Sequence, residues 1–261
     1  MNVNMTLARK IFFPKTPIND HLTNIAQYFG HVRYAPALIP DEVKFIFLCY
    51  TNRSGSNLLA EILASNKRLP LAGENLNFDT VIEHAQRKSF QSFQQYFTFL
   101  VRHTKENDTV AIKISPAHIE LLGKSGILDQ IISRSHFILI ERGDKLAQAI
   151  SHLIAFQTGK FMSTMDAQQA QAEPVFDREK LDTIIATIAD EYRDFNLFFG
   201  WNGIVPAQVV YEQMVHNPSQ TLAFVSDMIG VPDLEIKPHS VRLGRQAGRL
   251  NEEWRQKYLY E

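Results

Sequence analysis

A short polar segment between two apolar ones carries the residues best suited to holding an anion. Thr51–Asn57 (TNRSGSN) follows the apolar run Phe45–Tyr50 and leads into a helical pattern. A strand, a loop and a helix in this order point the N–H groups of the helix N-terminus at a bound anion, most often a phosphate. Arg53 supplies positive charge, Gly55 allows close backbone approach, and the donors at the helix start are Ser54, Ser56 and Asn57.

This loop matches neither of the two common nucleotide-binding patterns. It lacks the Gly-x-x-x-x-Gly-Lys-Ser/Thr spacing of nucleotide triphosphatases, and it lacks the three glycines of the dinucleotide fingerprint. The remaining donors can hold a phosphate–sulfate group without a metal. The alternative is that the loop only turns the chain and caps a helix.

A second segment has the same strand-to-helix character. Arg142 follows the apolar run His136–Ile140, and Ser151 lies about two and a half helical turns further on. Ligands of α/β folds bind at the carboxyl ends of strands, so both side chains can reach one anion there. Taken singly, Arg142 fits a surface ion pair and Ser151 an ordinary helix serine.

Alternating strands and helices predict an α/β fold with a parallel sheet and helices on both faces. The strands expected after Phe45–Tyr50 are Val110–Ile114, His136–Ile140 and Ala207–Val210. The helices expected are His21–Phe29, Asn57–Ser65, Phe90–His103, Asp144–Thr158, Asp177–Phe199 and Pro218–Ile229. The polar stretch Ser163–Glu173 fits either a mobile loop over a site or a solvated linker.

The composition narrows the possible functions. The 261 residues include 27 Lys plus Arg and 28 Asp plus Glu, a formal net charge of −1, which argues against broad binding of nucleic acids or anionic membranes. The single cysteine, Cys49, excludes an internal disulfide and a cysteine-based metal site, and no metal-ligand cluster is evident. No apolar stretch is long enough to span a bilayer, and the N-terminus lacks a signal-peptide pattern, so we expect a cytoplasmic location.

Three separated blocks resemble the bacterial sulfotransferases of the trehalose 2-sulfotransferase type. Tyr50–Leu59 is similar to that family's 5′-phosphosulfate loop, Arg142–Ser151 to its 3′-phosphate segment, and Arg245–Trp254 to its C-terminal signature. A weaker fourth block, Val209–Glu212, is similar to the Tyr-Glu-Asp-Leu element of sulfotransferases. The blocks keep the family's order, and residues 1–44 lie outside the resemblance.

The resemblance implies a three-layer P-loop-like domain over residues 45–261, with residues 1–44 as a lead-in packed on it. It implies 3′-phosphoadenosine 5′-phosphosulfate (PAPS) as the donor, the bisphosphate PAP as its product, and no metal. The donor would be held by these residues: Asn52, Arg53, Ser54, Gly55, Ser56, Asn57, Arg142, Ser151, Arg245, Gln246 and Ala247. The acceptor would be a hydroxyl of a carbohydrate, glycolipid or small metabolite. Some relatives are dimers, so a homodimer and a monomer both stay open.

The expected general base depends on how the segment Leu71–Phe78 is aligned with the family. One register places Asn77 at the base position and the other places Glu74 there. We favour Glu74, because a carboxylate accepts a proton and an amide does not. His118 and His152 are rival bases of lower rank. The resemblance also places Lys113 beside the sulfate or the acceptor, the alternative being a lysine at the solvent end of a strand.

Two other functions fit parts of the sequence. A small-molecule kinase with a degenerate phosphate loop would bind magnesium ATP, although the missing Gly-Lys-Ser/Thr argues against it. A non-catalytic relative would bind the nucleotide and transfer nothing. For a sulfotransferase, the resemblance implies Glu74, Arg53 and Lys113 as the catalytic residues.

Overall fold

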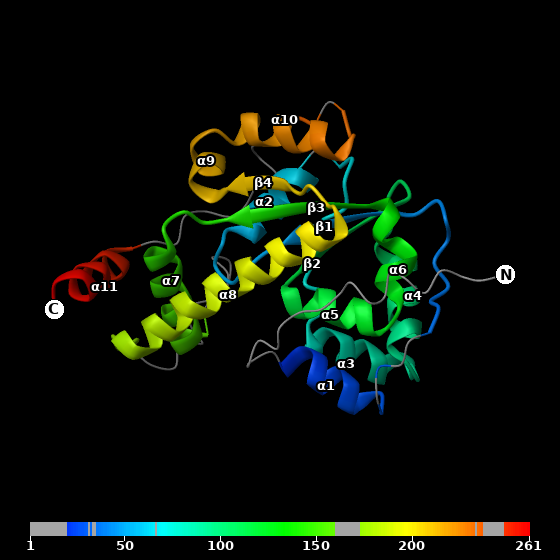
Figure 1. Cartoon of the computed structure of the whole chain (residues 1–261), viewed down its shortest axis with the longest axis horizontal. Helices are drawn as coiled ribbons and strands as arrows, with labels where there is room; N and C mark the ends of the chain where they lie inside the picture. Colours follow the sequence, from blue (N-terminus) through cyan, green and yellow to red (C-terminus); the bar gives the residue numbers. More distant parts are fainter. Residues whose placement is uncertain are drawn as a thin grey trace.

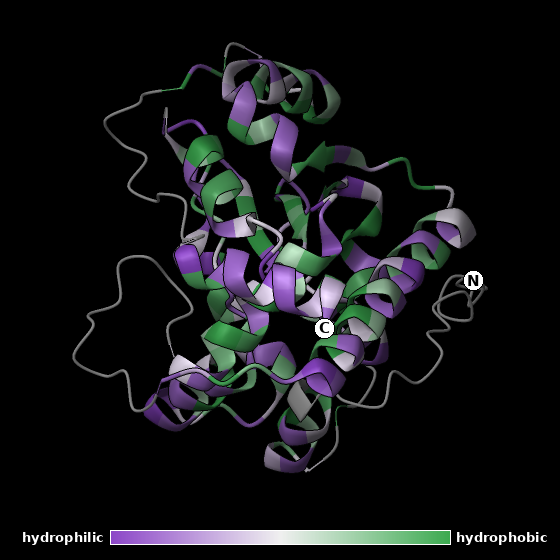
Figure 2. Cartoon of the chain, turned by 90° about the vertical axis from the view of Figure 1, so that its left-hand side faces the viewer, coloured by the Kyte–Doolittle hydropathy of each residue, from purple (hydrophilic) through white to green (hydrophobic). Residues whose placement is uncertain are grey.

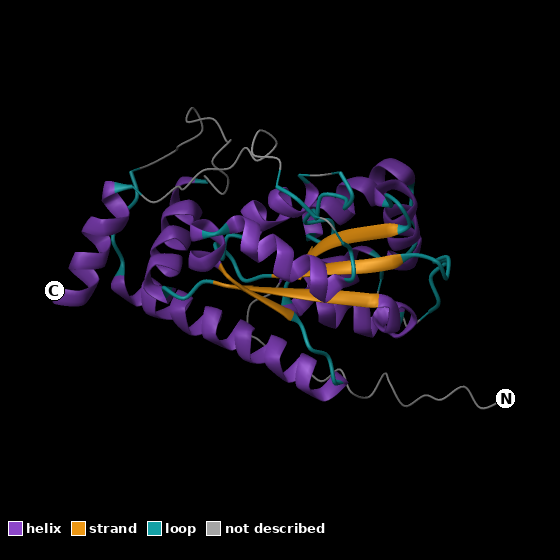
Figure 3. Ribbon diagram, turned by 90° about the horizontal axis from the view of Figure 1, so that it is seen from above, coloured by secondary structure: helices purple, strands orange, loops and turns teal. Residues whose placement is uncertain are grey.

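The computed structural model describes residues 20–30, 32, 35–65, 67–159, 173–232, 234–236 and 248–261. Within them, four strands form one sheet in the order β2-β1-β3-β4, and each neighbouring pair is parallel. Figure 3 shows these strands lying side by side with helices around them. The strands are β1 (Lys44–Cys49), β2 (Thr109–Ile114), β3 (Ser135–Glu141) and β4 (Ala207–Val210). The four strands expected from the sequence are confirmed.

The central strand β1 is buried on both faces. Phe45, Phe47 and Cys49 belong to one apolar core, whereas Ile46 and Leu48 belong to the other. Successive side chains of a strand point to opposite faces, so a continuous apolar run is what a strand between two helical layers requires.

Helices cover both faces of the sheet, as predicted. On one face lie α2 (Ser56–Ala64), α9 (Tyr211–His216) and α10 (Pro218–Ile229), which are drawn above the sheet in Figure 1. The other core is lined by eight of the described helices: α1 (Asp20–Tyr28), α3 (Phe78–Lys88), α4 (Phe93–Thr104), α5 (Pro116–Lys124), α6 (Ile127–Ile131), α7 (Lys145–Thr158), α8 (Arg178–Asn202) and α11 (Arg249–Tyr260). The architecture is a three-layer α/β fold.

Most helix boundaries lie close to the predicted ones. The two largest shifts are of three residues: α8 ends at Asn202 rather than Phe199, and α4 begins at Phe93 rather than Phe90. Helix α4 begins there because the Ser92 side chain accepts a hydrogen bond from the Gln95 N–H and caps the helix. The helices expected from the sequence did not include α3, although its apolar residues Phe78, Val81, Ile82 and Ala85 recur at helical spacing. Figure 2 shows how most helices mix hydrophilic and hydrophobic residues.

The sheet order determines where a ligand can bind. The chain leaves β1 for β2 on one side, and β3 and β4 lie on the other side of β1. Connections that leave in opposite directions open a crevice at the carboxyl ends of the two strands concerned. The loops that follow β1 and β3 carry Arg53 and Arg142, so both predicted anion-binding segments meet at this switch point.

Two further features concern the described residues outside this crevice. Helix α1 places Ile25 in the same core as Phe45 and Phe47. None of the helices in the ranges given above combines the length and the apolar character needed to cross a membrane.

Candidate active site at the carboxyl edge of the sheet

The loop after β1 has a backbone shape suited to wrapping an anion. Arg53 and Gly55 both adopt positive φ, 62° and 95°. A Cβ at Gly55 would lie 2.3 Å from Cδ2 of Tyr211, so the loop and this ring approach closely only because the residue is glycine. Among the described residues, no side chain caps the N-terminus of α2. The first N–H groups of that helix therefore face the loop.

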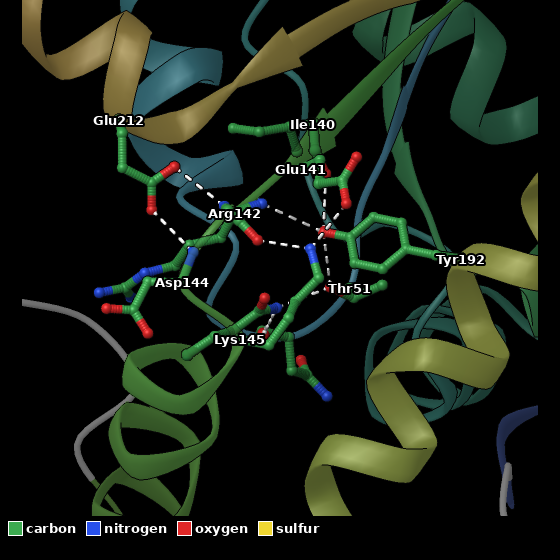
Figure 4. Close-up of polar contacts among 11 residues, drawn as sticks. Thr51, Ile140, Glu141, Arg142, Asp144, Lys145, Tyr192 and Glu212 are labelled. Carbon is green, nitrogen blue, oxygen red and sulfur yellow. Dashed lines mark hydrogen bonds and ion pairs between the residues drawn. The ribbon is translucent and has the colours of Figure 1, made fainter. Parts of the chain in front are cut away.

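Helix α7 holds the loop after β1 in place through a buried side-chain amide. Gln148 is fully buried, and its Nε2 donates to Oγ1 of Thr51 and to the carbonyl of Asn52, both at 2.7 Å. Thr51 Oγ1 donates to the Tyr192 hydroxyl at 3.2 Å, and that hydroxyl donates to the Ile140 carbonyl at 3.1 Å (Figure 4). Burial raises the pKa of Tyr192 to about 12, so the phenol keeps its proton. These bonds hold the loops after β1 and β3 in one network.

Three predicted anion-binding residues converge in the crevice. Nε of Arg53 donates to Oγ of Ser151 at 3.0 Å, and Nη1 of Arg142 donates to the carbonyl of Arg53 at 3.4 Å. Burial, and then the nearby Arg142, lower the pKa of Arg53. Two half-buried cations held close together favour an anion between them.

Four buried polar atoms around this crevice have no hydrogen-bond partner within the described ranges. They are Oγ of Ser54, Nε of Arg142, Oε1 of Gln148 and Nδ1 of His152. Buried polar groups are nearly always paired, so such a cluster indicates the place of a polar ligand or of water. The donors among these atoms, with the open N-terminus of α2, fit a phosphate or sulfate group.

A second cluster surrounds the predicted general base. The ammonium of Lys113 donates to Oδ1 of Asn57 and forms an ion pair with Oε1 of Glu74. The amide of Asn77 donates to Oε2 of Glu74 at 2.8 Å. Glu74, which the sequence analysis favoured as the base, and Asn77, the position given by the other register, are thus partners, with the carboxylate as acceptor and the amide as the group that orients it.

Lys113 is buried rather than at the solvent end of its strand. Its side chain is 3% exposed, and its Nζ lies 4.5 Å from the centre of the Tyr50 ring. Burial lowers the pKa of Lys113, and Glu74 opposes that effect. Since Asn57 belongs to the first turn of α2, Lys113 joins the anion loop to Glu74.

The two histidines that rivalled Glu74 have different surroundings. His118 is buried at the start of α5, where its Nδ1 accepts from the Ser115 N–H in a capping box. That contact gives His118 a role within its own helix. His152 lies beside Arg53, and burial together with that charge lowers its pKa from 6.5 to about 4.

We expect His152 to make the fold sensitive to acid. Its folded-state pKa lies below the unfolded value, so the unfolded chain binds the proton more readily between pH 6.5 and 4. Stability from this group is complete above pH 6.5 and is lost as the pH falls, by at most about 1.4 kcal/mol per pH unit. Urea unfolding at pH 7.5 and 4.5 should show a smaller loss for His152→Gln than for the unchanged chain. An equal loss in both proteins would contradict the assignment.

Some predicted site residues cannot be placed, and others were missed. Arg245, Gln246 and Ala247 lie outside the described residues, as does most of Ser163–Glu173. The sequence reasoning missed Gln148 and Tyr192, whose partners are remote in the chain. A signal for Gln148 was available, since it lies one helical turn before Ser151. Within the described ranges, no three His, Cys, Asp or Glu side chains gather as a metal site would require.

Comparison with known proteins gives three similarities. The model of the Stf0 sulphotransferase family matches residues 113–261. Trehalose 2-sulfotransferase of Mycobacterium tuberculosis (strain ATCC 35801 / TMC 107 / Erdman) is 28% identical over 138 residues, which span 53% of this chain and 51% of that protein. The sulfotransferase domain of the Synechococcus PCC 7002 olefin synthase aligns over 85% of this chain and 91% of that domain, with 17% identity and a TM-score of 0.46.

Proposed function

Because this chain belongs to the Stf0 sulphotransferase family, we propose that it transfers the sulfuryl group of PAPS to a hydroxyl group. The acceptor we propose is a carbohydrate, a glycolipid or a small metabolite, since the curated relative is a trehalose 2-sulfotransferase. That relative is matched over 51% of its length, and the loop Thr51–Asn57 and Glu74 precede the family match. The roles proposed for those residues are therefore supported by their geometry and not by the family match.

One observation carries the proposal. Arg53 contacts both Ser151 and Arg142, so the groups suited to the two ends of an adenosine bisphosphate meet in one crevice. Oγ of Ser54 and Nε of Arg142, which have no partner in the described part of the chain, add donors with the open N-terminus of α2 where two phosphates would need them.

The bound donor would supply an activated sulfuryl group, whose bond to the 5′-phosphate breaks as the acceptor oxygen bonds to sulfur. The protein would position the donor and the acceptor hydroxyl and stabilise the developing charge, as in phosphoryl transfer. Arg53 and the N–H groups of α2 would stabilise the charge that develops on the departing phosphate. Glu74 would take the proton of the acceptor hydroxyl, and Lys113 would hold Glu74 beside the loop.

Titration with adenosine 3′,5′-bisphosphate tests the donor site. At a ligand concentration 100 times Kd, binding to the folded state alone stabilises it by about 2.7 kcal/mol. For a chain of this size we expect the melting temperature to rise by roughly 5–10 °C. Magnesium ATP at the same concentration should give a much smaller rise.

The result separates the three functions. A rise with magnesium ATP and none with the bisphosphate would contradict the proposal in favour of a kinase. A rise with the bisphosphate, but no transfer of labelled sulfate to a panel of sugars that begins with trehalose, would favour a binding protein.

A further inference from the structure

The two helices at this site, α2 and α7, differ in whether side chains accept hydrogen bonds from the N–H groups at their N-termini. Helix α2 has no side-chain cap within the described residues, whereas α7 is capped by Asp144, whose Oδ1 accepts from the Ala147 N–H at 2.9 Å. The carboxylate of Glu212 also accepts from two N–H groups that lead into α7, those of Gly143 at 2.9 Å and Asp144 at 3.3 Å (Figure 4). An anion arriving at α7 would therefore meet a carboxylate in place of free N–H groups.

The sheet register brings Glu212 to this position. Glu141 of β3 pairs with Val210 of β4, so the residues that follow the two strands run side by side. Gly143 leaves room for the carboxylate, because a Cβ there would lie 3.3 Å from Oε2 of Glu212. The residue before Glu212, Tyr211, lies against both loops: its ring centre is 4.9 Å from the Arg142 guanidinium, and its edge lies against Gly55.

We propose that Glu212 is a positioning residue that fixes the loop after β3, so that Arg142 and Ser151, and not the N-terminus of α7, recognise the second phosphate of the donor. This inference rests on the proposed function. By bonding two successive N–H groups, the carboxylate holds the backbone on either side of Gly143 and thereby the direction of Arg142. The 5′-phosphate of the donor would bind at the uncapped N-terminus of α2, and its binding would not depend on the contact of Glu212 with the loop after β3.

The proposal predicts a selective loss of discrimination between two nucleotides. The probes are adenosine 3′,5′-bisphosphate and adenosine 5′-monophosphate, which differ only in the 3′-phosphate. In Glu212→Ala the preference for the bisphosphate, measured as a ratio of two Kd values by calorimetry, should fall by about three- to tenfold. Binding of the monophosphate should change little. Glu212→Gln, which keeps one acceptor oxygen, should restore part of the ratio.

The controls separate positioning from general stability. Gln213→Ala, at the next and exposed position of α9, should keep the ratio of the unchanged chain. Arg142→Ala should lower the ratio further than Glu212→Ala. A ratio unchanged in Glu212→Ala, with bisphosphate preferred by the unchanged chain, would overturn the role of Glu212 and leave the proposed function intact. No preference for the bisphosphate in the unchanged chain would overturn both.

Discussion

Replacing Glu74 by glutamine is expected to lower kcat by roughly 10²–10⁴-fold, the usual contribution of a general base. The substitution keeps the size of the side chain and removes its ability to accept the acceptor's proton. Nucleotide binding should stay within about twofold, because the donor-binding groups belong to other loops. Kinetics with labelled PAPS and trehalose as the first acceptor, together with calorimetry of the bisphosphate, measure both quantities.

The surroundings of Glu74 make this test sharper. Its two oxygens accept from Lys113 and Asn77, so the glutamine amide would turn N–H groups towards donors that need an acceptor. Lys113 would also lose its carboxylate partner and keep the oxygen of Asn57. Loss of a partner by a buried ammonium destabilises the fold, so the melting temperature must be measured beside kcat.

A control variant and a second substitution complete the experiment. Glu83→Gln makes the same chemical change on the exposed side of α3 and should leave kcat unchanged. Asn77→Ala keeps the carboxylate but removes the donor that orients it, and we expect a smaller loss of kcat than in Glu74→Gln. If Glu74→Gln kept more than about half of kcat, Glu74 would not be the base.

The sequence predicted those parts of the site that depend only on the order of strands and helices along the chain. Arg53 and Arg142 each follow an apolar strand, and parallel strands end at one edge of a sheet, so the pattern of strands and helices is enough to predict that the two side chains converge. Ser151 followed from its spacing along α7. Each of these inferences needs only a strand, its direction and the helix after it.

The missed residues depend on which strands are neighbours. Tyr192 reaches Thr51 and the strand β3 only because α8 crosses the face beneath both. The block Val209–Glu212 was part of the resemblance, but its contact with Gly143 was not predicted, because it exists only when β4 pairs with β3 in one register. The apolar patterns of these strands fit several sheet orders equally well, so contacts between residues this remote in the chain could not be derived from them.

The other large effect is expected at Arg53. Arg53→Gln should lower kcat/KM by about 10²–10³-fold, because it removes a donor aimed at charge that develops on the departing phosphate. Glutamine is the right replacement since Arg53 has a φ of 62°, and an unbranched side chain bears that conformation much as arginine does. Arg53→Lys should recover part of the loss, because it restores charge without the planar fork that reaches Ser151.

A measurement that does not depend on activity accompanies this prediction. The charge of Arg53 contributes to the low pKa of His152, so removal of the guanidinium should raise the His152 pKa from about 4. An NMR titration of the imidazole protons would record that rise, whereas Arg87→Gln on the exposed side of α3 should leave both the titration and kcat/KM unchanged. A raised His152 pKa with full activity would place Arg53 in the crevice but outside the reaction. An unchanged His152 pKa would contradict the placement of the Arg53 guanidinium beside His152, whatever the activity of the variant.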